Sequence, residues 1–125
     1  MKIQVEVPKL DIDAKLHGTT RPLTIEQQGE RRIVAALIDH LAKSGFSPCE
    51  VHSDEVVKTA DKKSMMEEVF NLDDCWVGFK KGKHTRFVYF VLGNGMDMIS
   101  DWRFDKDDID GFNAAMEAFK AEELF

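Results

Sequence analysis

The sequence predicts a single α+β domain, in which an antiparallel β-meander sheet carries a long N-terminal helix, a short middle helix and a C-terminal helix. Three observations lead to this fold class. A helical pattern with start and stop signals covers residues 24–45, several later segments alternate apolar and polar residues, and an apolar face with helical spacing covers residues 112–119. The 125 residues match the usual size of one domain, so we expect a single domain over residues 1–125.

The N-terminal segment, residues 1–23, begins with a strand pattern. Ile3, Val5 and Val7 alternate with polar residues up to Pro8, and a weaker alternation continues to Leu16. The two alternations predict either an N-terminal hairpin or an extended arm, and "HGTTRP" then interrupts regular structure.

The first helix has signals at both ends. Thr24 and Gln27 have the spacing of a capping box, in which each side chain bonds the other residue's backbone N–H. Gly45 is suited to the left-handed residue that ends a helix, Phe46 to the contact that follows it, and Pro48 prevents continuation. The apolar face between these signals consists of Val34, Leu37, Ile38 and Leu41.

The central part of the chain alternates at the strand period. Residues 49–52 and 55–59 predict two short strands around a Ser53–Asp54 turn, and "DKKSMMEEVFNL" predicts a short helix. Three further strands are predicted from "DCWVGFK", "RFVYFVL" and "MDMISDWRF". The second of these is apolar on both faces, which predicts a central strand covered on both sides.

Two turn regions complete the expected topology. Asn94-Gly95 predicts a type I′ hairpin turn, because both residues tolerate positive φ. A phosphate-binding loop would need a third glycine and a helix starting at once, whereas a strand pattern follows here. Asp108 or Asp110 is expected to cap the C-terminal helix.

The net charge of −6 comes from the last quarter of the chain, where residues 97–125 hold nine acidic and three basic side chains. A nucleic-acid-binding protein usually has a basic surface, and the one dense basic run is "KKGKHTR". We therefore do not expect nucleic acid as a partner. An alternative is that the acidic quarter mimics nucleic acid and regulates a DNA-binding partner.

The expected location is the cytoplasm, without membrane association. No apolar run approaches the ~20 residues that span a bilayer, and the N-terminus lacks a signal-peptide core. Cys49 and Cys75 do not form a disulfide framework, so we expect two thiols.

Asp97, Asp101 and His52 are the candidate metal-binding residues. On one strand the two aspartates lie about 13 Å apart, too far to share a proton or a metal ion without other ligands. We interpret Asp101 as a surface residue or as the cross-strand partner of Arg86. Cys49 and His52 have the spacing of half a zinc site, but no second pair completes it.

Other candidates have simpler explanations. A nucleophile pair of Cys75 with His52 or His84 lacks any local signature, and Cys75 lies in an apolar alternation that predicts burial. The acidic run from Asp105 to Gly111 has its glycine one position out of register for a calcium loop. We therefore expect no catalytic residue, no cofactor and no metal ion.

The segments "HSDEVV", "EEVFNLDD" and "VLGNGMDMISDW", within residues 49–102, resemble small proteins common in phages and prophages. The resemblance implies a shared fold and an accessory protein of a mobile element, without a catalytic role. The leading functional hypothesis is a non-enzymatic interaction protein with a protein partner or self-association as a homodimer, and Trp76 or Trp102 as a contact. The alternative is a small enzyme or a metal- or ligand-binding protein that uses the acidic and histidine residues on the sheet.

Overall fold

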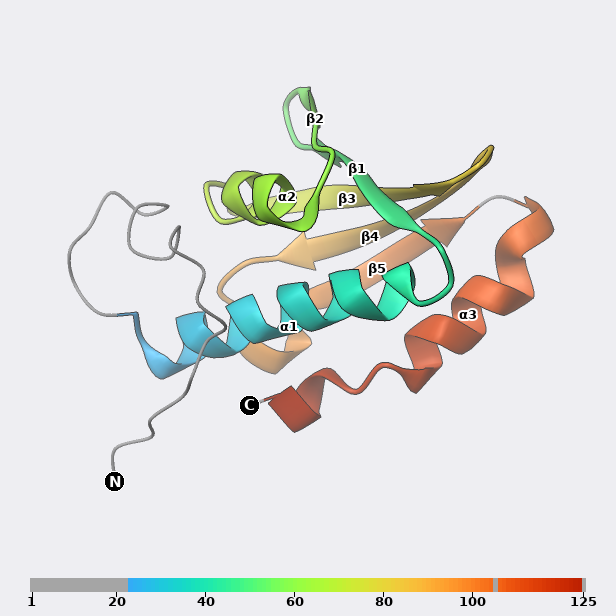
Figure 1. Ribbon diagram of the computed structural model, residues 1–125. Helices are drawn as coiled ribbons and strands as arrows, with labels where there is room; N and C mark the ends of the chain where they lie inside the picture. Colours follow the sequence, from blue (N-terminus) through green and yellow to red (C-terminus); the bar gives the residue numbers. More distant parts are fainter. Residues whose placement is uncertain (1–22, 105, 125) are drawn as a thin grey trace.

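The structure, a computed structural model, describes residues 23–104 and 106–124 and confirms the predicted α+β domain (Figure 1). Helices pack on one five-stranded antiparallel sheet. The elements are α1 (Ile25–Ala42), β1 (Ser47–His52), β2 (Val56–Lys58), α2 (Lys62–Val69), β3 (Asp74–Lys81), β4 (His84–Val91), η1 (Gly95–Asp97), β5 (Ile99–Phe104), η2 (Lys106–Asp108), α3 (Ile109–Ala118) and η3 (Ala121–Leu124).

The strands lie in the order β2-β1-β3-β4-β5, and each neighbouring pair is antiparallel. The predicted meander of three consecutive strands is confirmed as β3, β4 and β5. In the middle of the sheet, Trp76 lies opposite His52 on one side and Tyr89 on the other, and Tyr89 lies opposite Asp101.

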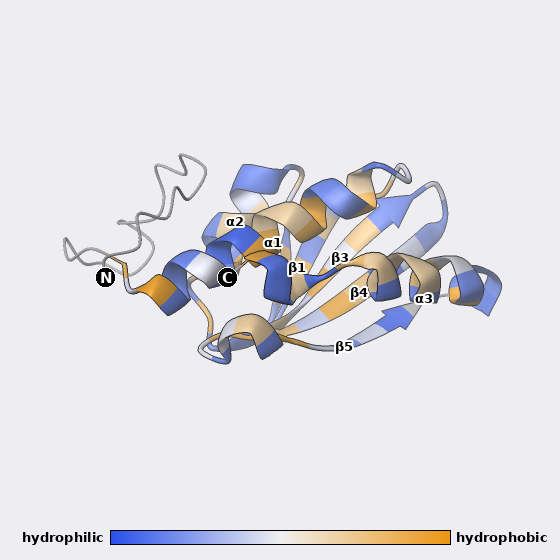
Figure 2. Cartoon of the chain, turned by 90° about the horizontal axis from the view of Figure 1, so that it is seen from below, coloured by the Kyte–Doolittle hydropathy of each residue, from blue (hydrophilic) through white to orange (hydrophobic). Residues whose placement is uncertain are grey.

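The described helices all pack on one face of this sheet. Alternate residues of β3 and β4 enter a single hydrophobic core with the buried sides of α1, α2 and α3. Figure 2 shows that α1, β4 and α3 each carry hydrophobic stretches interrupted by hydrophilic ones, as expected of elements with one buried side. The fully buried strand residues include Val77, Phe79, Val88 and Phe90.

The predicted ends of α1 are confirmed. Thr24 N–H donates to Gln27 Oε1 at 2.9 Å, and Gln27 N–H donates to Thr24 Oγ1 at 3.1 Å. At the other end Gly45 has φ of +90°, and Phe46 N–H donates to the Leu41 carbonyl at 3.2 Å. The strong local signals therefore produce the structure they predict.

β4 is the middle strand of the meander, as predicted, whereas β3 is the middle strand of the whole sheet. The prediction that helices or strands cover β4 on both faces is wrong for residues 23–104 and 106–124, in which its residues alternate between buried and half-buried. Phe87 and Tyr89 are the half-buried aromatic residues of β4 that point away from the helices. The apolar residues on the second side of β4 therefore lie on a face that no helix of residues 23–104 and 106–124 covers.

The type I′ turn at Asn94-Gly95 is also wrong, although a turn does join β4 to β5. Asn94 has φ of −90°, and the positive φ angles belong to Gly93 and Gly95. The short helix η1 follows, and β5 begins only at Ile99. The loop differs from the predicted turn because its backbone donates hydrogen bonds to Glu30 on α1, a residue far away in the sequence.

The start of α3 differs from the expected side-chain cap. Asp108 is the N-cap residue, but its carboxylate makes no capping hydrogen bond. It binds Arg86 on β4 instead, with nitrogen–oxygen distances of 2.6 and 2.9 Å. The proposed cross-strand bridge from Arg86 to Asp101 is therefore absent.

The strands expected within residues 1–23 fall almost entirely on residues 1–22, which lie outside the described residues. None of the helices in residues 23–104 and 106–124 has the length and hydropathy needed to cross a bilayer.

Candidate functional site

The candidate site is the sheet face that points away from α1, α2 and α3, which we call the open face. The strand alternation places every second residue there, and no helix of the described chain covers it. By register, the open face is formed by Glu50, His52, Val56, Lys58, Asp74, Trp76, Gly78, Lys80, Thr85, Phe87, Tyr89, Val91, Asp101 and Arg103.

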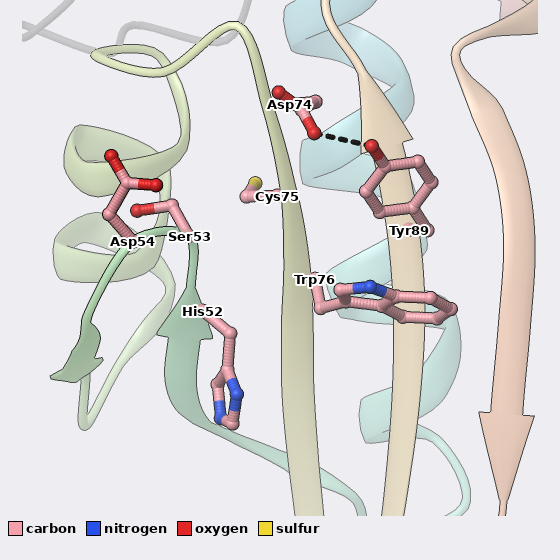
Figure 3. A pocket seen from close by; sticks show the side chains of 7 residues that line it. All are labelled: His52, Ser53, Asp54, Asp74, Cys75, Trp76 and Tyr89. Carbon is pink, nitrogen blue, oxygen red and sulfur yellow. Dashed lines mark hydrogen bonds between the residues drawn. The ribbon is translucent and has the colours of Figure 1, made fainter.

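A group of side chains in mutual contact forms the centre of the open face. The rings of Trp76 and Tyr89 lie with their centroids 4.9 Å apart. The guanidinium of Arg103 lies 4.2 Å from the centre of the Trp76 ring, a cation–π arrangement. Tyr89 OH donates to the Asp74 carboxylate, and this bond raises the pKa of Tyr89 above its usual value (Figure 3).

Gly78 makes room for a second aromatic pair. A Cβ atom at this position would lie 2.8 Å from a ring carbon of Phe87 and 3.0 Å from Cγ of Glu50. Because the side chain is absent, the Phe87 ring lies across β3 and meets His52 edge-on, with centroids 5.3 Å apart. The glycine thus connects the aromatic side chains of β4 with those of β1.

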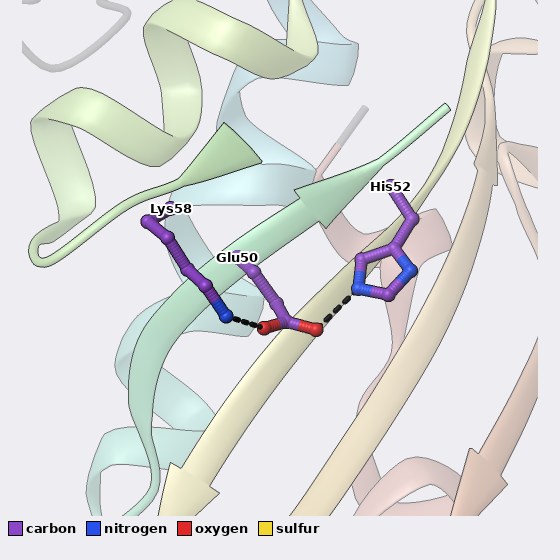
Figure 4. A network of polar contacts seen from close by, with 3 residues as sticks. All are labelled: Glu50, His52 and Lys58. Carbon is purple, nitrogen blue, oxygen red and sulfur yellow. Dashed lines mark hydrogen bonds and ion pairs between the residues drawn. The ribbon is translucent and has the colours of Figure 1, made fainter. Parts of the chain in front are cut away.

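A short polar network lies beside this pair (Figure 4). The Glu50 carboxylate accepts hydrogen bonds from Lys58 Nζ at 2.8 Å and from the His52 ring. These two bonds, that from Lys58 first, lower the pKa of Glu50 below its usual value. The negative charge of Glu50 is therefore neutralised within the open face.

One end of the open face is hollowed. A pocket of about 420 Å³ lies between the β1–β2 turn and the start of β3, with carboxylates on its rim and aromatic rings in its wall (Figure 3). Its lining residues are His52, Ser53, Asp54, Asp74, Cys75, Trp76 and Tyr89. Burial raises the pKa of Cys75 to about 12, so this thiol is protonated and is not a nucleophile at neutral pH.

The three candidate metal residues do not share one site. His52 lines the pocket, Asp101 lies on β5, and Asp97 lies in η1 rather than on the same strand as Asp101. Within residues 23–104 and 106–124, no three His, Cys, Asp or Glu side chains are grouped to hold a metal ion. Cys49 is half-buried, and burial raises its pKa.

The two tryptophans have different surroundings. Trp76 lies on the open face, whereas Trp102 is partly buried against the core, and its indole N–H donates to Asn113 on α3 at 2.9 Å. Of the two candidate contacts, Trp76 is thus the one on the face that the described helices leave uncovered. Sequence alternation cannot separate them, because it does not show which face of the sheet the helices cover.

Arg86 belongs to the basic run "KKGKHTR" in the sequence, but in the structure it is buried and does not add to the exposed basic surface. The residue is 5% exposed, and its guanidinium pairs with Asp108 and lies 3.9 Å from the centre of the Phe46 ring. Lys80, on the open face, and Lys83, in the hairpin turn, remain exposed. The surface at this hairpin is therefore less basic than its sequence indicates.

Comparison with known proteins identifies no relative: the chain matches no family model, no curated protein and no solved structure.

Proposed function

We propose that this protein is a non-enzymatic interaction protein that binds another protein chain through the open face. The observation that carries the proposal is the layer of Trp76, Tyr89 and Phe87 on a sheet face that no helix among the described residues covers. Aromatic and arginine side chains are enriched at the centres of protein–protein interfaces, and Arg103 stacks on Trp76 here. The resemblance to phage-type proteins suggests an accessory role of this kind.

The chemistry of the open face favours a protein over a nucleic acid. Its cations, Lys58, Lys80 and Arg103, are matched by the carboxylates of Glu50, Asp74 and Asp101. A polyanion needs an excess of positive charge, which this face does not supply. A protein surface with mixed charge and an aromatic centre fits both features.

Site-specific crosslinking tests the proposal. We would replace Tyr89 with the photoreactive residue p-benzoylphenylalanine and irradiate cells that naturally express the protein. The matched control places the same residue at Ala114, which is exposed on α3. We expect a covalent protein adduct from position 89 and none from position 114. Lack of an adduct at position 89, with the protein folded, would refute an interaction through this face.

Ligand binding in the pocket is the second candidate function. The observation that favours it is the 420 Å³ hollow, whose lining includes the carboxylates of Asp54 and Asp74 and the rings of Trp76 and Tyr89. A small cationic ligand would suit two carboxylates and two aromatic rings. Such a ligand should raise the melting temperature of the wild-type protein but not that of an Asp74→Asn variant.

A further inference from the structure

We infer that the occupant of the open face is a second copy of this chain, bound across a twofold axis with its strands running antiparallel to those of the first copy. This inference rests on the proposed function and names its partner. It is carried by the distribution of charge along the strands of the open face.

The charges of the open face are sorted by position along the strands. Asp74 lies at the start of β3, and Asp101 is level with Trp76 through Tyr89. The backbone of Arg103 is level with Gly78 through Phe87, two residues further along β3, and its guanidinium reaches back over the Trp76 ring. The acidic half therefore contains Asp54, Asp74 and Asp101. The basic half contains Lys58, Lys80 and Arg103 together with one carboxylate, Glu50, which accepts a hydrogen bond from Lys58.

This arrangement selects one way of packing two copies face to face. A twofold axis that lies in the interface, perpendicular to the strands, reverses the second copy, so Asp74 faces Lys80 of the second copy. Symmetry makes this contact twice. An axis parallel to the strands would instead place acids on acids and bases on bases, which opposes association.

The centre and one end of the open face suit the same arrangement. The aromatic layer of Trp76, Phe87 and Tyr89 becomes the apolar centre of the interface, with charged residues around it. The pocket beside Asp74 lies where the Lys80 ammonium of the second copy arrives. Its carboxylates and aromatic rings are suitable contacts for an ammonium group.

The edges of the sheet are less suited to pairing between copies. On the edge strand β5, the Trp102 backbone N–H already donates to its neighbour Asp101 at 2.8 Å. The other edge strand, β2, has three residues. Short edge strands and occupied N–H groups both oppose strand addition, so the face is the better surface.

The size of the open face predicts a dissociable dimer. Five strands and the eight residues of β3 cover about 24 by 26 Å, or roughly 600 Å² per copy. A standard interface buries about 800 Å² per partner. Association should therefore depend on protein concentration and weaken as salt screens the charges.

Charge reversal tests both the occupant and its orientation. We would compare wild type, Asp74→Lys, Lys80→Glu and the double variant by sedimentation velocity over a wide range of protein concentration. Glu117→Lys, an exposed position on α3, is the matched control, and circular dichroism checks folding. We expect each single variant to weaken self-association about tenfold or more, and Glu117→Lys to leave it unchanged.

The single variants discriminate between the two orientations. With antiparallel strands each single variant places like charges at the contacts and the double variant restores opposite charges, so the dimer should weaken and then return. With parallel strands wild type, the single variants and the double variant all place like charges together, so no reversal would change association. An equimolar mixture of the two single variants should also form dimers. A wild-type monomer at all concentrations, or a dimer that no reversal affects, would overturn the inference. A crosslinked adduct of another mass would then leave the proposed function intact, whereas no adduct would reject both.

Discussion

The backbone N–H of Gly95 donates to Glu30 Oε2 at 2.8 Å, across 65 residues of sequence. The same oxygen accepts the N–H of Gly93 at 2.7 Å. The glycine-rich loop thus binds an anion, and that anion is a carboxylate of the protein's own first helix. Burial raises the pKa of Glu30, while the two backbone hydrogen bonds act in the opposite direction.

Glu30→Ala should lower the free energy of unfolding by roughly 1–3 kcal/mol, because the buried Gly95 N–H loses its acceptor. Chemical denaturation measures this loss. Glu30→Gln retains an acceptor oxygen, so a smaller loss is expected. If both variants unfold like wild type, Glu30 does not hold the loop.

Asp108→Asn should destabilise the fold by about 3–5 kcal/mol, since it leaves the guanidinium of Arg86 buried without its carboxylate partner. The neighbouring Asp107 is exposed, and Asp107→Asn serves as the control. Equal stability of the two variants in denaturant titrations would show that the ion pair contributes nothing.

The same ion pair predicts a pH dependence. Hydrogen bonding to Arg86 holds the pKa of Asp108 below its usual 3.8, so the folded state favours the ionised carboxylate. The stabilisation is therefore present above the unfolded pKa and is lost as the pH falls through the folded one. Unfolding measured from neutral to acidic pH should show a steeper loss for wild type than for Asp108→Asn. Parallel curves would contradict this assignment.

Gly78→Ala should destabilise the protein by about 1–3 kcal/mol, because the added methyl group would displace the Phe87 ring. A smaller side chain at position 87 removes the obstacle. In a Phe87→Leu background the same change should cost clearly less, and a double-mutant cycle gives the coupling. Additive effects would indicate that the ring does not depend on the glycine.

Substitution of one tryptophan should mainly weaken self-association, and substitution of the other should mainly lower the stability of the fold. Trp76→Ala removes the centre of the open face and should weaken association more than it lowers the melting temperature. Trp102→Ala removes core contacts and the bond to Asn113, so it should lower stability first. Sedimentation and thermal melts measure both properties, and the opposite pattern would argue against this division.

Zinc, calcium or magnesium should leave the melting temperature unchanged relative to chelator. A ligand that binds only the folded state at a hundredfold above its dissociation constant adds about 2.7 kcal/mol. A clear increase with one ion would favour the metal-binding hypothesis, and variants of Asp97, Asp101 and His52 would then locate the site.

Local signals in the sequence determined the fold class. Thr24, Gln27, Gly45 and Phe46 act over a few residues, so the beginning and end of α1 follow from spacing alone. The alternation in residues 74–91 likewise predicts β3 and β4, because a strand has period two whatever it packs against. The order of the meander follows from its short connections.

Tertiary structure decided where the chemistry lies. Arg86 is buried because Asp108 approaches from 22 residues away, and Gly95 adopts its turn because Glu30 lies beside it. Period-two alternation assigns Trp76 and Trp102 to faces only relative to their own strands. Which face is open depends on the side where the helices pack, and that depends on contacts between residues far apart in the chain.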